Sequence, residues 1–346
     1  MAQIDVKTPT DSTYPIIIER GLLHSDLRAR FGLGRVVVLS NVTVGPLHGE
    51  ALADRLDAPL ICMLDGERYK SLNTVENFYA DLVRAGADRK TTVIALGGGV
   101  VGDAAGFAAA SYMRGVPLIQ VPTSLLSMVD SSVGGKVGVD IPQGKNLVGA
   151  FKQPEAVLID PDVLQTLPDT EWINGMAEVI KHGLLADEQL LDPALWAREN
   201  AAEMVTRAVQ VKVDVVQRDP YEQGERAHLN LGHTFAHAIE QVTNYAVPHG
   251  AAVGVGLLAA AKLSDRLGMC DKALVDRVEQ LLGEVGLPRH TAGLDPQTLL
   301  GAMRTDKKWR DGISRFVLMR GIGQIEIVED IDNELILAVL EEMKAR

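Results

Sequence analysis

Three histidines and one glutamate have the residue types and spacing that can bind a metal ion. His233 and His237 are four residues apart, which places both imidazoles on one face of a helix, and His249 lies sixteen residues after His233. Imidazoles at this spacing can ligate Zn²⁺, which also accepts a carboxylate and leaves a fourth position for a substrate. Glu178 is a candidate carboxylate, because an unpaired charge would be costly in its otherwise apolar helical stretch. The alternative is that these histidines serve packing or lie at the surface, and the absence of HExxH disfavours a zincin-type hydrolase.

A glycine-rich segment can approach a dinucleotide. It reads Gly97, Gly98, Gly99, Val100, Val101, Gly102 and Asp103. It follows an apolar run and precedes an Ala-rich helical pattern, which is the context that GxGxxG requires for a pyrophosphate at a helix N-terminus. The acidic residue usually found about 20 positions later is replaced by Gln120 and Val121. A glycine-rich turn that only packs a helix on a sheet therefore stays open as an alternative.

Other polar residues suit an anionic ligand. An acidic turn, Asp65-Gly66-Glu67-Arg68-Tyr69-Lys70, follows another apolar run and suits a ribose contact, although a solvated turn has the same composition. Basic residues recur at turns or among apolar neighbours, where phosphate and carboxylate groups can be bound. These residues are Arg114, Lys136, Lys145, Lys181, Lys212 and Arg226. The alternative for each of them is an ordinary solvated surface position.

Charge and composition argue against some classes of binding partner. A net charge of −12 argues against a nucleic acid partner, because a phosphate backbone demands a basic surface. The most apolar stretch, residues 251–263, is interrupted by Gly254 and Gly256 and is shorter than the ~20 residues of a membrane span. Cys62 and Cys270 have no metal-type spacing, and the N-terminus lacks a secretory pattern. We therefore expect a cytoplasmic protein that binds neither nucleic acid nor membrane.

The secondary structure expected to position these residues changes along the chain, from alternating strands and helices to mainly helices. Apolar runs at 36–40, 60–64, 92–96, 116–121 and 156–159 predict buried strands that alternate with helices, for instance 73–87. Helical periodicity then dominates at 171–185, 194–218, 228–242, 251–267, 271–285 and 333–344, with strands only at 315–319 and 324–327. The pattern predicts an α/β domain over 1–168 and a mostly α-helical domain over 169–346.

Six stretches together resemble the 3-dehydroquinate synthases of the sugar phosphate cyclase superfamily over nearly the whole chain. They are residues 65–70, 97–103, 121–124, 144–151, 175–183 and 229–235. The resemblance implies a Rossmann-like NAD-binding domain followed by a helical domain that binds metal and substrate, in a homodimer. It also implies a phosphorylated sugar acid as the substrate, NAD and Zn²⁺ or Co²⁺ as cofactors, and conversion of 3-deoxy-D-arabino-heptulosonate 7-phosphate into 3-dehydroquinate and phosphate.

The resemblance assigns roles to individual residues. It makes Glu178, His233 and His249 the metal ligands and turns His237 toward the substrate. Besides the glycine-rich segment, NAD is expected to contact Asp65, Glu67, Lys70, Thr123, Ser124, Lys136 and Lys145. Substrate is expected at Asp130, Lys136, Asn146, Lys181, Lys212, Arg226, Asn230, His237 and Lys307, with Arg114 reaching into the partner's site. The sequence Asp306-Lys307-Lys308 aligns either way, so the choice between its two lysines stays open.

Three rival functions remain at this level. A different sugar phosphate cyclase is disfavoured by Asn230 and His237, because the relatives tend to alter that stretch. A metal-dependent polyol dehydrogenase usually carries Pro-Thr-Thr leading into Thr-Gly-Ser-Glu, whereas residues 122–128 read PTSLLSM. A binding protein without catalysis is disfavoured by the intact set of candidate ligands and lysines. Ala236 and Ala251 depart from the family pattern, which usually has Gly and Glu there, without removing a candidate ligand.

Overall fold

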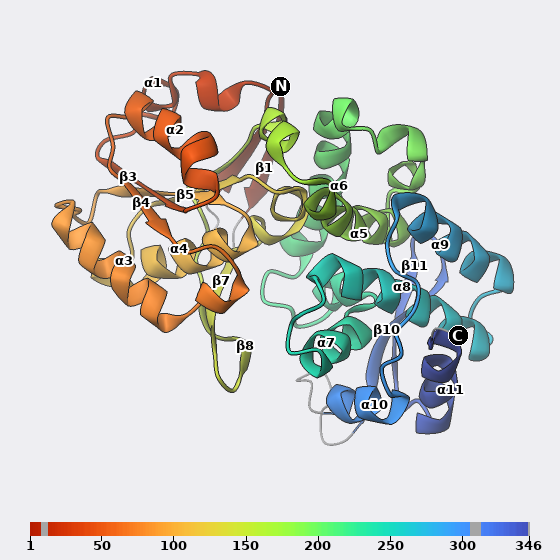
Figure 1. Cartoon of the computed structure of the whole chain (residues 1–346). Coiled ribbons are helices and arrows are strands. Elements are labelled where there is room, and N and C mark those ends of the chain that lie inside the picture. Colours follow the sequence, from red (N-terminus) through yellow and green to blue (C-terminus); the bar gives the residue numbers. More distant parts are fainter. Residues whose placement is uncertain (8–12, 305–312, 345–346) are drawn as a thin grey trace. The chain divides into compact units, whose positions relative to one another are not determined.

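The computed structural model describes residues 1–7, 13–304 and 313–344 (Figure 1). They form two compact units. The first, which we call the α/β unit, comprises Met1–Trp172 and Arg198–Val213, and the second, the helical unit, comprises Ile173–Ala197 and Asp214–Arg346. The predicted combination of a Rossmann-like α/β part and a mainly helical part is confirmed.

A seven-stranded sheet forms the centre of the α/β unit, in the order β1-β2-β9-β6-β5-β3-β4. Its strands are β1 (Ala2–Lys7), β2 (Thr13–Ile18), β3 (Val36–Asn41), β4 (Leu60–Met63), β5 (Thr92–Gly97), β6 (Leu118–Pro122) and β9 (Ala156–Ile159). Every residue of β3, β5, β6 and β9 is buried, as expected for parallel strands covered on both faces, and these strands match the predicted apolar runs. β1 pairs antiparallel with β2, so the sheet that was expected to be parallel has an antiparallel edge.

Four helices belong to the α/β unit: α1 (Leu27–Phe31), α2 (Glu50–Arg55), α3 (Leu72–Arg84) and α4 (Gly99–Ser111). The Ser71 hydroxyl caps α3 by accepting the Thr74 N–H at 3.3 Å, and the chain turns away at Gly86, whose φ is +67°. Helix α4 packs against β5 and β6 through fully buried alanines, including Ala104 and Ala108. The small alanine side chains therefore allow α4 to pack close to the sheet.

A hairpin that the sequence analysis did not predict packs against α4. It consists of β7 (Lys136–Ile141) and β8 (Gly144–Phe151), paired antiparallel. A Cβ on Gly106 of α4 would lie only 2.4 Å from Val137 Cγ1, so the missing side chain allows the hairpin to approach. The hairpin carries Lys136, Lys145 and Asn146.

Helix α8 (His249–Arg266) lies at the centre of the helical unit and is buried along most of its length. It packs against α7 (His233–Val242), α9 (Lys272–Val285), α11 (Asn333–Met343) and β10 (Arg315–Gly321). The unit also contains α10 (Pro296–Arg304), β11 (Gln324–Glu329) and most of α5 (Asp169–Leu185), while α6 (Ala201–Arg218) contributes to both units. A helix that is apolar on all sides is a core helix, as the sequence indicated for this stretch.

Three helix boundaries differ from the prediction. The helix expected from residue 194 begins at Ala201, because the preceding residues form short turns capped by Asp192, whose carboxylate accepts the Ala194 N–H at 2.9 Å. The helix expected from residue 228 is broken by Gly232, whose φ of +77° is non-helical, and α7 begins at His233. The helix expected from residue 251 begins at His249, directly after Pro248, so this histidine is the first residue of α8.

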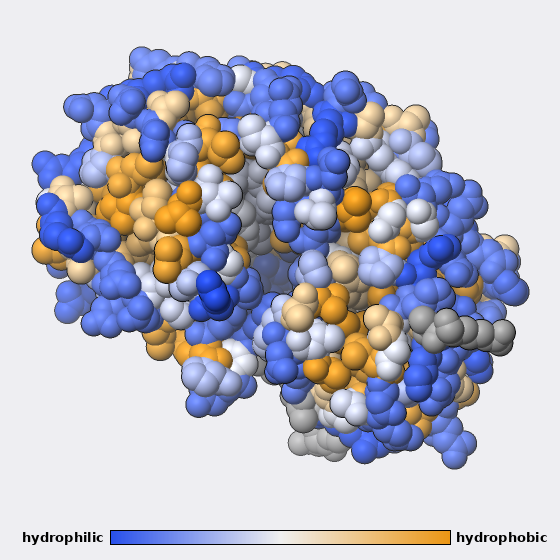
Figure 2. All heavy atoms as spheres, in the orientation of Figure 1, coloured by the Kyte–Doolittle hydropathy of each residue, from blue (hydrophilic) through white to orange (hydrophobic). Residues whose placement is uncertain are grey.

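The visible surface of both units is mostly hydrophilic, with smaller groups of hydrophobic residues, as Figure 2 shows. In the part of the chain that the structure describes, no helix combines the length and the apolar character needed to cross a membrane.

Candidate functional site

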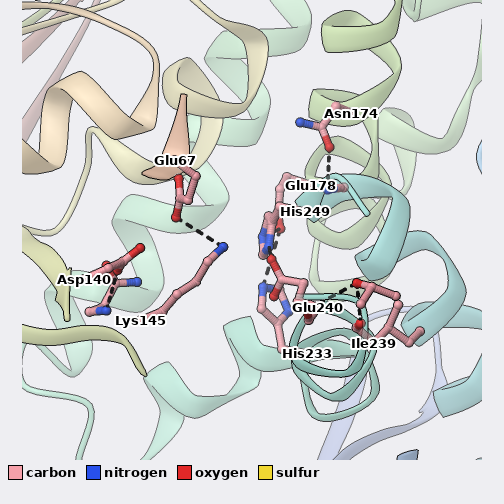
Figure 3. Close-up of polar contacts among 12 residues, drawn as sticks. Glu67, Asp140, Lys145, Asn174, Glu178, His233, Ile239, Glu240 and His249 are labelled. Atoms are coloured by element: carbon pink, nitrogen blue, oxygen red, sulfur yellow. Dashed lines mark hydrogen bonds and ion pairs between the residues drawn. The ribbon is translucent and has the colours of Figure 1, made fainter. Parts of the chain in front are cut away.

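Glu178, His233 and His249 converge within the helical unit (Figure 3). They come from α5, α7 and α8, and one ligand atom of each lies within 4.8 Å of those of the other two. The Nε2 atoms of His233 and His249 lie 3.5 Å and 3.3 Å from Glu178 Oε1. The Glu178 side chain is fully buried, whereas the His249 side chain is 32% exposed, so the cluster is accessible from one side.

Close contacts between backbones bring the three helices together. A Cβ on Gly256 of α8 would lie 2.1 Å from the carbonyl oxygen of Gly232, directly before His233. A Cβ on Gly250 would lie 1.9 Å from the carbonyl oxygen of Asn174, one helical turn before Glu178 on α5. The Asn174 side chain also accepts the Gly250 N–H at 2.5 Å. Glycines therefore permit the approach that places the two histidines next to the glutamate.

The other nitrogen of each imidazole faces an oxygen atom. His233 Nδ1 lies 3.1 Å from the carbonyl oxygen of Leu231, and His249 Nδ1 lies 3.3 Å from Glu240 Oε1. Donation from Nδ1–H to these acceptors leaves the Nε2 lone pair directed toward Glu178. This is the tautomer that metal-binding histidines adopt when an acceptor fixes their second nitrogen.

The electrostatics of the cluster favour a positive charge between its ligand atoms. Burial alone would raise the pKa of Glu178, but the Lys181 ammonium and the two imidazoles hold it well below its ordinary value. Burial lowers the pKa of His249, and the carboxylates of Glu178 and Glu240 more than compensate, raising it to about 9. Neither carboxylate oxygen of buried Glu178 has a hydrogen bond of good geometry, although Lys181 and both imidazoles are at ion-pair distance. Two imidazole nitrogens and one carboxylate fit Zn²⁺ or Co²⁺ with an open fourth position.

His237, the third histidine of the sequence pattern, is not part of this cluster. Its ring centroid lies 5.6 Å from that of His233 in an edge-to-face arrangement on α7. The structure thus groups His233, and not His237, with Glu178 and His249, a choice that spacing left open because both histidines lie on the same side of one helix.

The glycine-rich segment forms the connection between β5 and α4, as its pattern indicated. Gly97 ends β5, and Gly98 is the N-cap residue of α4. A Cβ on Gly97 would lie 2.6 Å from Val101 Cβ, and one on Gly99 would lie 3.1 Å from Ser131 Oγ. Close packing, and not positive φ, therefore requires these glycines. Gln120 on β6 donates from Nε2 to the Gly102 carbonyl at 3.1 Å, so this hydrogen bond ties the first turn of α4 to the sheet.

Residues of β6 and the turn that follows it lie against the same connection. The Thr123 N–H donates to the Gly97 carbonyl at 2.9 Å. Ser124 Oγ donates to Ser127 Oγ at 2.9 Å. A Cβ on Gly98 would lie 3.4 Å from Ser124 Oγ, so Thr123 and Ser124, two of the predicted cofactor contacts, are beside the N-terminus of α4.

Lys70 is the centre of a second polar cluster in the α/β unit. It is buried, and its Nζ lies 2.7 Å from Asn146 Oδ1, 3.2 Å from Asp103 Oδ2, 3.4 Å from Glu67 Oε1 and 3.9 Å from Asp140 Oδ1. Lys145 Nζ lies 3.1 Å from Glu67 Oε1, a contact visible in Figure 3. The structure therefore brings together several residues that the sequence analysis had assigned separately to cofactor and substrate.

Burial and charge shift the pKa values of this cluster in opposite directions. Burial would lower the pKa of Lys70, but the carboxylates around it raise the pKa above its ordinary value. Burial raises the pKa of Asp103 to about 6, even though Lys70 opposes the shift. Burial also acts to raise the pKa of Glu67, but Lys70 and Lys145 lower it overall.

Asp140 and Asp65 make contacts in the α/β unit that the sequence analysis did not predict. Asp140 was not predicted, yet its Oδ1 accepts the Asn146 N–H at 2.8 Å. Asp65 was predicted as a cofactor contact, and its carboxylate accepts from Asn41 Nδ2 at 2.8 Å and Thr43 Oγ1 at 2.7 Å. No pattern in the sequence marked Asp140, because its partners lie on the other strand of the hairpin and on a separate turn.

The remaining predicted substrate contacts fall into both units. In the α/β unit, Lys136 is exposed at the start of β7, and Arg114 is exposed after α4 with a φ of +70°. Buried Lys212 on α6 reaches Asp130, with its Nζ 2.7 Å from Asp130 Oδ1. Lys307 and Lys308 lie outside the described residues.

In the helical unit, the predicted contacts are held by acidic residues that the sequence analysis missed. Buried Arg226 donates its backbone N–H to Asp219 Oδ2 at 3.0 Å. Asn230 Nδ2 donates to Glu222 Oε1 at 2.8 Å. Both contacts are local, because Asp219 and Glu222 lie only seven and eight residues before their partners.

Comparison with known proteins agrees with these features. Residues 60–174 match the family model of the 3-dehydroquinate synthase N-terminal domain, and residues 175–309 match that of the C-terminal domain. A 3-dehydroquinate synthase from Xanthomonas campestris pv. campestris is 48% identical over 352 aligned positions, covering 94% of this chain and 95% of that protein. One from Nostoc sp. is 42% identical, covering 98% and 99%.

The fold is also similar to those of two synthases whose solved structures contain NAD⁺ and a metal ion. 2-Deoxy-scyllo-inosose synthase, in a crystal structure with carbaglucose-6-phosphate, NAD⁺ and Co²⁺, has a TM-score of 0.89 at 25% identity and covers 99% of this chain and all of that one. 2-Epi-5-epi-valiolone synthase from Streptomyces hygroscopicus, with NAD⁺ and Zn²⁺ bound, has a TM-score of 0.88 at 29% identity and 98% coverage of both chains. Both domain models match in chain order, and relatives in this family align over nearly their full length. The chain belongs to the 3-dehydroquinate synthase family.

Proposed function

We propose that this chain converts 3-deoxy-D-arabino-heptulosonate 7-phosphate into 3-dehydroquinate and inorganic phosphate, as a lyase of the shikimate pathway that depends on NAD and a divalent metal. The convergence of Glu178, His233 and His249 carries the proposal, because it supplies the metal site that this chemistry needs. A metal ion held by Glu178, His233 and His249 would supply Lewis-acid polarisation of a substrate hydroxyl, and bound NAD would supply reversible hydride transfer.

The helical unit would hold the metal and one part of the substrate. Glu178, His233 and His249 offer one oxygen and two nitrogens, and the partly exposed His249 leaves the cluster open to a ligand. Lys181 lies against Glu178 and is almost fully buried, so it would present its charge to a substrate oxygen at the same point. Arg226, Asn230 and His237 would orient the sugar acid.

The α/β unit would hold NAD. The N-terminus of α4 and the close backbone at Gly97, Gly98, Gly99 and Gly102 suit a pyrophosphate. Asp65, Glu67, Lys70, Asp103, Thr123, Ser124 and Lys145 would contact the rest of the dinucleotide. We assign NAD to a domain over residues 1–168 and metal and substrate mainly to a domain over residues 169–346.

A substrate with a carboxylate and a phosphate requires cationic groups at both ends. Lys212 is suited to this role, because Asp130 fixes its ammonium and little of the side chain is exposed. Lys136, which would also border the cofactor, Asn146 and Lys307 would add contacts. In a homodimer, Arg114 would reach the partner's site. Oriented cations of this kind stabilise the charge that develops as phosphate leaves.

Among related activities, the identities favour a dehydroquinate synthase. The 3-dehydroquinate synthases named above share 42% and 48% of their residues with this chain, whereas the two other cyclases share 25% and 29%. Sulfoacetaldehyde reductase from Bifidobacterium kashiwanohense, at 14% identity and a TM-score of 0.69, shares the fold alone. We also propose a cytoplasmic location and no nucleic acid or membrane partner, in keeping with the net charge of −12.

The test is a product balance. Purified protein is incubated with NAD⁺, Zn²⁺ and the heptulosonate phosphate, while phosphate, dehydroquinate and NADH are measured. We expect phosphate and dehydroquinate in equal amounts, no net NADH, and loss of turnover on chelation or in Glu178→Gln. Accumulating NADH without phosphate would instead identify a dehydrogenase, and a folded, metal-loaded protein without turnover would refute the proposal.

A further inference from the structure

Glu240 is a buried acidic residue that the proposed catalytic set does not include. It lies on α7, seven residues after His233, and its side chain is 4% exposed. A carboxylate in such a position is costly unless a polar partner compensates for the lost water. Glu240 Oε1 lies 3.3 Å from Nδ1 of His249, the first residue of α8 (Figure 3).

The imidazole of His249 is thereby placed between two carboxylates. Its Nε2 faces Glu178 Oε1 at 3.3 Å, and its Nδ1 faces Glu240 Oε1 at the same distance. An imidazole held through one nitrogen can present the other in only one direction. The contact with Glu240 therefore determines where the Nε2 lone pair points.

We propose that Glu240 is the positioning residue of the metal centre, holding His249 in the orientation and tautomer in which Nε2 binds the ion. The inference rests on the proposed function, because it takes Glu178, His233 and His249 as the ligands. Glu240 itself would not touch the ion. It accepts the Nδ1 proton of His249, makes the ring a stronger donor, and adds a second negative charge near a divalent cation.

The two histidines differ in what holds them. The acceptor for His233 Nδ1 is the backbone carbonyl of Leu231, which is fixed by the turn that precedes α7. The acceptor for His249 is a side chain, and the His249 ring is the more exposed of the two, at 32% against 12%. Of these two Nδ1 contacts, the one to His249 can be removed by a single substitution.

The experiment measures metal affinity in the full chain. Metal-free protein is titrated with Zn²⁺ against a chromophoric chelator, and urea unfolding of each metal-free variant shows whether it is folded. We expect Glu240→Leu to bind Zn²⁺ about 10- to 100-fold more weakly than the parent chain, the range found when such support is lost. Glu240→Gln should lose less, because its amide oxygen still accepts the Nδ1 proton without the charge.

Thr243→Val is the matched control. Thr243 lies at the C-terminal end of the same helix, where its hydroxyl donates to the Ile239 carbonyl at 2.7 Å. This variant disturbs α7 near Glu240 but leaves the carboxylate in place, so it should bind Zn²⁺ as the parent does. If Glu240→Leu does not fold, the nearly isosteric Glu240→Gln decides the question.

The outcomes separate this inference from the proposed function. Zn²⁺ affinity that falls in Glu178→Gln but is unchanged in folded Glu240→Leu and Glu240→Gln would overturn the role of Glu240 alone. A parent chain without Zn²⁺ affinity would overturn the metal site itself. Loss in both Glu240 variants, graded as described and absent from Thr243→Val, supports the positioning role.

Discussion

Gly250 lies where one added methyl group would disturb the candidate metal centre without altering a ligand. A Cβ built on Gly250 would be 1.9 Å from the Asn174 carbonyl oxygen, and real Cβ atoms essentially never approach another atom within 3.0 Å. In Gly250→Ala, α8 must therefore move away from α5 by about 1.1 Å, the difference between these distances. Neither helix can avoid this by a rotamer change, because the carbonyl oxygen belongs to the backbone and the backbone also fixes the position of a Cβ.

The consequence for the ligands follows from their positions. His249 directly precedes Gly250, and Glu178 lies one turn after Asn174, so the shift separates two of the three ligands. Metal–ligand distances tolerate only about 0.2 Å. We expect Gly250→Ala to weaken Zn²⁺ binding by at least about 10- to 100-fold. Overpacking should also lower the free energy of unfolding by about 1–3 kcal/mol.

The assay combines competition with a chromophoric chelator and urea unfolding of the metal-free protein. Gly301→Ala is the control, because Gly301 lies within α10 with ordinary helical φ and nothing within 4 Å of an added Cβ. This variant should bind Zn²⁺ normally and gain up to about 1 kcal/mol of stability from the better helix propensity of alanine. A Gly250→Ala protein with the parent's Zn²⁺ affinity would refute the claim that the glycine contact fixes the ligand geometry.

Two further predictions concern the cluster around Lys70. Because burial raises the pKa of Asp103 to about 6, its protonated form stabilises the fold fully below the unfolded pKa of about 3.8, and this contribution is lost as pH rises through about 6. In urea titrations, the free energy of unfolding of Asp103→Asn relative to the parent should therefore increase between about pH 4 and pH 7, and a pH-independent difference would contradict this reasoning. Lys70→Met leaves the surrounding carboxylates without their buried cation, and thermal or urea unfolding should show a loss of about 3–5 kcal/mol. Lys90→Met, at an exposed turn, should change stability by less than about 0.5 kcal/mol, and equal effects of the two substitutions would refute the central role of Lys70.

The central strands of the sheet could be predicted because burial on both faces requires continuous apolar runs. β3, β5 and β9 occur where such runs occur, and the turn from β5 into α4 follows the glycine pattern. The β7–β8 hairpin could not be found in this way. β7 places Val137, Val139 and Ile141 at alternate positions, but its partner β8 has no clear alternation. The position of the hairpin also depends on the room that Gly106 leaves on α4.

The candidate site was predicted in part. Residue types identified Glu178 and the histidines as metal-binding candidates, and family resemblance selected His249 in preference to His237. Spacing alone could not make this choice, because His233 and His237 share one helix face, whereas His249 begins another helix. Glu240 and Asp140 could not be found from the sequence, because the sequence does not distinguish a carboxylate with partners in the folded structure from a solvated surface carboxylate.

By itself, the sequence determined which segments must be buried, where glycines allow tight turns, and which side chains have donor atoms for a metal or an anion. These properties are local, because they depend on residue type and on spacing within one strand or helix. The tertiary structure alone decided which donors meet. The backbone contacts Gly250–Asn174 and Gly256–Gly232 bring together residues from three helices, and the distances that define a metal centre exist only after those helices have packed.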